Sequence, residues 1–128
     1  MATACTLIPG DGIGPDITEA TLAILEAAGA SFDWDRQVAG AAGVEQKGTP
    51  MPDETIESIK RTRLALKGPL ETPVGEGYRS VNVALRKTFD LYANVRPVRT
   101  IQPGGRYAGI DIVLVRENTE GLYSGVEH

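Results

Sequence analysis

The sequence predicts an α/β protein whose sheet is mainly parallel. Short apolar runs alternate with segments of helical periodicity, and clusters of glycine and proline separate them. Apolar residues make up 41% of the chain and charged residues 23%, which are the proportions of a globular domain. A length of 128 residues suits one ordinary domain with a sizeable core.

The chain begins with a strand, a turn and a helix. Residues 4–9 predict a short buried strand, and the turn GDGIG connects it to a helix over residues 16–28. Apolar side chains recur along one stripe of this helix, at Ile17, Ala20, Ile24 and Ala27. Pro15 is tolerated in the first turn of the helix, and Gly29 is suited to end it.

Four segments continue the alternation. They are a half-exposed strand at 31–38, a loop rich in glycine and proline at 39–52, a helix at 53–61 and a strand at 63–67. Asp53 is predicted as the N-cap of this second helix. Ile56, Ile59 and Leu64 are predicted to face inward.

The second half of the chain opens with another glycine- and proline-rich segment. The predicted elements are a loop at 68–77, a helix at 80–89, a strand at 91–99, a turn at 103–105 and a strand at 110–115. Ser80 can cap the helix. Val81, Leu85 and Phe89 recur four residues apart and predict its inward face.

Composition excludes several classes of function. The net charge of −4 argues against general binding of nucleic acid, and no apolar run approaches the about 20 residues that span a bilayer. The N-terminus lacks a basic segment followed by an apolar one, so no signal peptide is expected. Cys5, the only cysteine, fits a reducing compartment, and we predict a cytoplasmic location. His128 is the only histidine, which argues against a histidine-based triad or metal site.

Positive charge is nevertheless concentrated in residues 79–99, which hold five cations and a single acid. On a helix, Asn82 and Arg86 share a face. Ser80 lies at the helix N-terminus, where free backbone N–H groups favour an anion. An arginine matches a carboxylate through two parallel hydrogen bonds. The pattern favours a site for a polycarboxylate or a phosphate.

Arg96 and Arg116 extend this hypothesis, because each lies within or at the end of an otherwise apolar strand. A partly buried arginine needs a partner, since an unpaired buried charge is costly. Each could pair with one of the 17 internal acids, or both could join Arg86 around one anion. Both interpretations stay open at this point.

Three other features also carry alternative interpretations. The glycines of GDGIG miss the spacing of the dinucleotide-phosphate motif G-x-G-x-x-G, so a tight turn is favoured there over a phosphate site. The loop at 68–77 could bind a ligand or serve only as a connector. Tyr123 could be an edge residue of the core or a proton donor.

Three segments together resemble a known family. IPGDGIGPDI, LKGPLETPVGEGYRSVNVALRKTFDLYANVRPV and VRENTEGLYSGVEH are similar to the isocitrate and isopropylmalate dehydrogenases, which are β-decarboxylating enzymes, and most similar to the NAD-dependent isocitrate branch. The resemblance implies that family's α/β fold, which is not the Rossmann fold and has two domains around a cleft. Residues 1–96 would begin the large domain and residues 97–128 the small domain, with neither domain complete.

The resemblance also implies roles for individual residues. Isocitrate would be bound by Ser80, Asn82, Arg86, Arg96 and Arg116. The cofactor would lie along Leu70, Glu71 and Thr72, with Asn82 also beside it. Tyr123 would be the catalytic tyrosine that helps to reprotonate the enolate. Glu71 departs from the family pattern, in which a smaller or neutral residue is common.

The implied reaction is the oxidative decarboxylation of isocitrate with reduction of NAD. Mg²⁺ or Mn²⁺ would assist as a Lewis acid. The catalytic lysine and the metal-binding aspartates come later in the family's chain, partly from the second subunit of a homodimer, so this chain holds no metal ligand and alone should be inactive. Two alternatives stay open: another 2-hydroxy diacid such as homoisocitrate as substrate, or a non-catalytic chain that binds a tricarboxylate.

Overall fold

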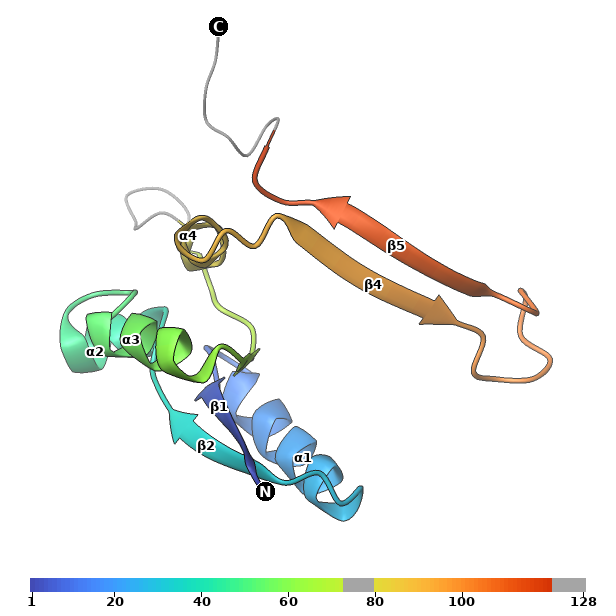
Figure 1. Cartoon of the computed structure of the whole chain (residues 1–128), viewed down its shortest axis with the longest axis horizontal. Coiled ribbons are helices and arrows are strands. Elements are labelled where there is room, and N and C mark those ends of the chain that lie inside the picture. Colours follow the sequence, from blue (N-terminus) through green and yellow to red (C-terminus); the bar gives the residue numbers. More distant parts are fainter. Residues whose placement is uncertain (73–79, 121–128) are drawn as a thin grey trace, which may run out of the picture. The chain divides into compact units, whose positions relative to one another are not determined.

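A computed structural model describes residues 1–72 and 80–120 of the chain (Figure 1). The chain forms two compact units, residues 1–81 and 82–128. The division into domains after residue 96 stays a prediction for the complete protein.

The first unit contains a three-stranded parallel sheet in the order β2-β1-β3. Its elements are β1 (Thr3–Ile8), α1 (Gly14–Ala27), β2 (Phe32–Arg36), α2 (Ala41–Lys47), α3 (Asp53–Thr62) and β3 (Ala65–Lys67). The central strand β1 contributes most of the buried apolar core through Cys5, Leu7 and Ile8, each at most 2% exposed. The parallel sheet predicted for this half is therefore confirmed.

The second unit departs from the predicted sheet. Helix α4 (Val81–Thr88) leads into β4 (Ala93–Arg99), and β4 pairs with β5 (Asp111–Glu117) in antiparallel fashion, as a sheet of two strands. The connection over residues 100–110 contains no helix, and a short connection of this kind returns the chain antiparallel. The prediction of a mainly parallel sheet was wrong for these two strands.

Helix α1 begins at Gly14 and buries a different face from the predicted one. Ile17 and Ile24 are 44% and 68% exposed, whereas Gly14 and Thr18 are buried. A Cβ atom at Gly14 would lie 2.4 Å from the carbonyl oxygen of Pro9, so only glycine allows this close approach. The helix ends as predicted, because Gly29 adopts φ +79° and donates to the carbonyl of Glu26.

Three further predictions were wrong in detail. The predicted loop at 39–52 contains α2, a helix whose start is fixed by a distant residue, Asp11. Helix α3 begins with Asp53 itself, so its N-cap is Pro52 and not Asp53. The negative charge of Asp53 lies in the first turn, where it interacts favourably with the positive end of the helix dipole. Leu64 is 45% exposed rather than inward. The predicted inward position of Ile56 is confirmed, since it is 8% exposed.

A network of hydroxyl groups joins α3 to the sheet. The Thr6 hydroxyl lies 2.7 Å from that of Ser58 and 2.8 Å from that of Thr62. Ser58 also donates to Asp35 Oδ2 at 2.6 Å, and Arg61 pairs with the same oxygen. The hydrogen bonds from Ser58 and Gln37, with the nearby Arg61 guanidinium, lower the pKa of the Asp35 carboxyl. The packing of α3 on the sheet therefore depends on an ionised aspartate.

We expect the free energy of unfolding of Asp35→Asn to change less with pH than that of the wild type. A carboxyl whose pKa is lowered in the folded state stabilises it above the unfolded pKa of about 3.9, and this stabilisation is lost as the pH falls through the lower folded value. Urea unfolding between pH 3 and 7, followed by the fluorescence of the single Trp34, should show wild type and variant converging at low pH. A constant difference between the two would contradict the prediction.

The backbones of two segments cross at very short range where β1 and β3 end. A Cβ atom at Gly68 would lie 1.9 Å from the carbonyl oxygen of Pro9, and one at Gly10 would lie 2.1 Å from that of Pro69. Hydrogen bonds close the crossing, because Gly68 N–H donates to Ile8 and Asp11 N–H donates to Pro69. The glycines of the GDGIG turn thus allow the two backbones to lie in close contact.

Gly68→Ala should destabilise the first unit by more than about 3 kcal/mol, because the contacting atom is a backbone oxygen that cannot rotate away. Gly105→Ala is the matched control, since its Cβ would meet only the Gln102 carbonyl at 3.6 Å, an ordinary contact. Urea unfolding monitored at Trp34 measures both variants. Equal midpoints would show that the crossing can relax.

Candidate functional site

The predicted site residues fall in both units. Leu70, Glu71, Thr72 and Ser80 belong to the first, and Asn82, Arg86, Arg96 and Arg116 belong to the second. Tyr123 lies outside the described residues. The roles of all these residues stay predictions.

In the first unit, the segment predicted to lie along the cofactor is held by Asp11. The side chain of Asp11 is buried, and its Oδ2 accepts the N–H of Glu71 at 3.0 Å. Its Oδ1 accepts the N–H groups of Ala41 and Ala42 at 3.0 and 3.3 Å. One carboxylate therefore fixes both the start of α2 and the main chain at residue 71.

The side chains of this segment remain accessible while its backbone is held. Glu71 and Thr72 are exposed and Leu70 is half-buried. A Cβ atom at Gly40 would lie 2.9 Å from Leu70 Cδ2, so Leu70 packs closely over that glycine. This combination of a fixed backbone and exposed side chains is suited to binding a ligand.

The role of Asp11 could not be predicted from the sequence. The GDGIG motif, which contains Asp11, predicted only a tight turn. The Asp11 partners Ala41, Ala42 and Glu71 are at least 30 positions away, and they offer backbone groups that no residue type reveals.

In the second unit, Arg86 lies half-buried near the end of α4. Val81 and Leu85 are buried, as predicted for the apolar face of this helix. The carbonyl of Arg86 accepts the N–H of Leu91 at 2.8 Å, which closes the turn between the helix and β4. Asn82 and Arg86 are four residues apart and share one face of the helix, as predicted.

Arg96 and Arg116 lie on the same face of the β4–β5 hairpin. Asn94 is paired with Arg116 and Arg96 with Leu114, so the side chains of Asn94, Arg96 and Arg116 point to one side. Arg96 Nε donates to Asn94 Oδ1 at 3.1 Å. Among the described residues, neither Arg86 nor Arg96 forms an ion pair with a carboxylate.

Asn118 connects the end of β5 to the turn that follows α4. Its N–H donates to the carbonyl of Tyr92 at 3.0 Å, and its Nδ2 donates to the carbonyl of Leu91 at 3.3 Å. The side chain is only 6% exposed. Leu91 N–H also donates to the carbonyl of Arg86. Hydrogen bonds through Leu91 therefore connect Arg86 to Asn118, which lies two positions after Arg116. We call this series of hydrogen bonds the Asn118 junction.

Glu117, between Arg116 and Asn118, is committed to the turn after β5. Its carboxylate accepts the N–H groups of Thr119 and Glu120 and the Thr119 hydroxyl. The backbone hydrogen bonds, above all that from Thr119, lower the pKa of the Glu117 carboxyl. This acid is therefore charged and engaged at the end of the strand.

Substitutions at Asn118 should distinguish the loss of its side-chain hydrogen bond from the cost of burying a charge at this position. Asn118→Ala removes one hydrogen bond and should cost about 1 kcal/mol. Asn118→Asp places a buried charge against the Leu91 carbonyl and should cost roughly 2–3 kcal/mol. Thermal unfolding measures both variants. An unchanged midpoint in Asn118→Ala would show that the amide donor has no role, and equal losses in the two variants would show that the added charge has no cost.

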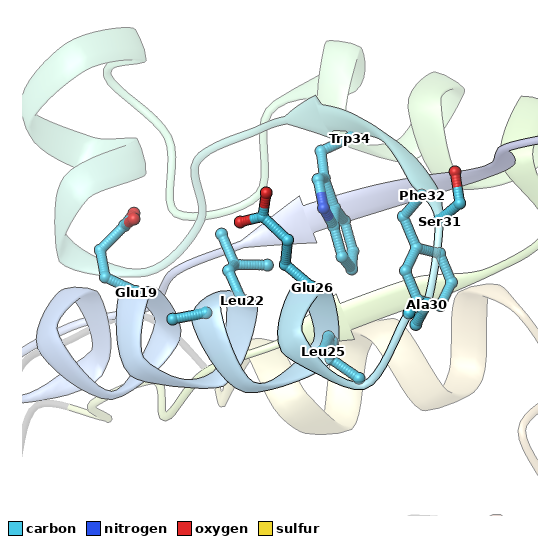
Figure 2. Close-up of a pocket in the computed structure, with 10 residues that line it drawn as sticks. Glu19, Leu22, Leu25, Glu26, Ala30, Ser31, Phe32 and Trp34 are labelled. Carbon is cyan, nitrogen blue, oxygen red and sulfur yellow. The ribbon is translucent and has the colours of Figure 1, made fainter.

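A separate groove of about 650 Å³ lies between α1 and β2 (Figure 2). Leu22, Leu25, Phe32 and Trp34 provide apolar surface, with Glu19 and Glu26 beside them. The Phe32 and Trp34 rings lie 4.7 Å apart between centroids. None of the predicted site residues lines this groove.

Residues 1–72 and 80–120 lack two further classes of site. No group of three or more His, Cys, Asp or Glu side chains there is placed to hold a metal ion. None of the helices in these ranges is long and apolar enough to span a membrane.

Comparison with known proteins identifies close relatives. The family model for isocitrate/isopropylmalate dehydrogenase matches residues 4–128. The NADP isocitrate dehydrogenase of Thermus thermophilus is 57% identical, over 96% of this chain and 26% of its own length. A probable mitochondrial NAD isocitrate dehydrogenase subunit alpha of Caenorhabditis elegans is 50% identical, over 96% of this chain and 35% of its own.

A solved structure supports the same relationship. The chain superimposes on isocitrate dehydrogenase from Methylococcus capsulatus with a TM-score of 0.89 and 54% identity, covering 100% of this chain and 38% of the other. The predicted family and the predicted α/β fold of that family are confirmed. The chain spans only about a quarter to a third of the length of the curated relatives it matches.

Proposed function

This chain belongs to the isocitrate/isopropylmalate dehydrogenase family, and on that premise we propose that the complete protein oxidises and decarboxylates isocitrate to 2-oxoglutarate. Support comes from relatives that are named isocitrate dehydrogenases and are 50–57% identical to this chain. As predicted from the resemblance, these 128 residues alone would not be active, because the catalytic lysine and the metal-binding aspartates are expected elsewhere.

The Asn118 junction is the observation that supports an isocitrate site most directly. It ties the backbones next to Arg86 and Arg116 together, while Asn94 orients Arg96 on the same face as Arg116. Isocitrate carries three carboxylates, and guanidinium groups bind carboxylates in paired hydrogen bonds. In the proposal, these arginines hold the carboxylates, and Ser80 and Asn82 orient the substrate.

We propose NAD as the hydride acceptor. The relatives named above include both an NADP and an NAD enzyme, and the sequence of this chain resembles the NAD branch. The exposed side chains of Glu71 and Thr72, on a backbone held by Asp11, are suited to receive the nicotinamide end of a dinucleotide. When bound, NAD supplies the oxidising equivalent, and this chain contributes orientation.

The family resemblance also implies Mg²⁺ or Mn²⁺. The described residues offer no cluster that fits such an ion, so no step is assigned to a metal through them. A homodimer and a cytoplasmic location remain further parts of the proposal.

Arg86→Ala in the complete enzyme should raise the KM for isocitrate about 10- to 150-fold, the equivalent of roughly 1.5–3 kcal/mol for a hydrogen bond to a charged group. Arg106→Ala is the control, because Arg106 lies in the hairpin connection over the Tyr107 ring. Steady-state kinetics with isocitrate, homoisocitrate and isopropylmalate would identify the substrate. An unchanged KM for isocitrate in Arg86→Ala would contradict the assignment.

A further inference from the structure

The carboxylate of Asp11 has an unusual position for an acidic residue in a glycine-rich turn. It is buried, with 7% of the residue exposed, and all three N–H groups that reach it come from backbone of other segments. No described cation pairs with it. A buried carboxylate is retained only where hydrogen bonds compensate its lost hydration.

The backbone of Asp11 is bound to the same segment as its side chain. Its N–H donates to the Pro69 carbonyl at 2.7 Å, while Oδ2 accepts from Glu71 N–H at 3.0 Å. Asp11 therefore forms hydrogen bonds to the main chain on both sides of Leu70. A Cβ atom at Gly40 would lie 2.2 Å from Oδ2, so the space for this carboxylate exists only because residue 40 is glycine.

We propose that Asp11 is the positioning residue of the cofactor segment 70–72, setting the main chain from which Leu70, Glu71 and Thr72 would contact the nicotinamide dinucleotide. This inference rests on the proposed function. Asp11 itself would not touch the cofactor, because its two oxygens are occupied by backbone donors. Its effect would be to keep the segment in its binding shape before the cofactor arrives.

Asp11→Asn is the test, because it keeps the size of the side chain and replaces one acceptor oxygen with a donor. The amide cannot accept from both Glu71 and α2, so one of these contacts is lost. In the complete protein we expect the Kd for NADH, measured by fluorescence titration, and the KM for NAD to rise about tenfold, the loss of one hydrogen bond to a charged group. The KM for isocitrate should stay within about twofold by the same reasoning.

Asp35→Asn is the matched control. Asp35 is a hydrogen-bonded aspartate of the same unit that contacts Ser58, Gln37 and Arg61 rather than residues 69–71. Both variants should lower the unfolding midpoint, but only Asp11→Asn should weaken NADH binding. An unchanged Kd in Asp11→Asn, or an equal loss of NAD and isocitrate binding, would overturn the proposal.

A second measurement needs no variant and no activity. Amide hydrogen exchange of the wild-type protein should show protection of Glu71 N–H, because this group donates to a buried carboxylate. Exchange at the rate of an open loop would overturn the positioning role even if Asp11→Asn failed to fold. Lack of turnover with isocitrate in the wild type, with Glu71 protected and NADH binding lost in Asp11→Asn, would instead reject the proposed function alone.

Discussion

The buried carboxylate of Asp11 is the interaction on which the first unit depends. Three segments separated in sequence meet there: the turn after β1, the start of α2 and the segment that follows β3. The turn supplies the carboxylate, and the other two segments supply backbone N–H groups that would otherwise lose their hydration without replacement. These partners are main-chain atoms, so the contacts themselves need no particular side chain, although the space for the carboxylate requires glycine at residue 40. The side chains of Glu71 and Thr72 stay exposed.

The close crossing of backbones makes this arrangement possible. Gly10, Gly14 and Gly68 allow approaches to Pro9 and Pro69 that any larger residue would prevent. The short distances bring the end of β3 beside the turn after β1, and Asp11 can then reach Glu71 within one side-chain length. The glycines and the aspartate of this turn thus have one structural explanation, which is the close contact between the turn and the segment after β3.

The sequence predicted what local patterns determine. The strand of Cys5 and Leu7, the Gly29 helix end and the apolar face of Val81 and Leu85 were all found as expected. Helix α2 was missed because its start is fixed by Asp11, 30 residues away. The buried face of α1 was misassigned because close backbone contact at Gly14 and hydrogen bonding by Thr18 outweigh the apolar stripe. Contacts through backbone atoms leave no signature in residue type.

Two arginines lie close together on the β4–β5 hairpin, and their like charges bear on the isocitrate site that we propose. Arg96 and Arg116 lie on one face of a hairpin, where like charges near each other repel. Asn94 between them accepts from Arg96 but carries no charge to offset the repulsion. In the isocitrate site that we propose, a ligand with several carboxylates would offset this repulsion more fully than a singly charged anion.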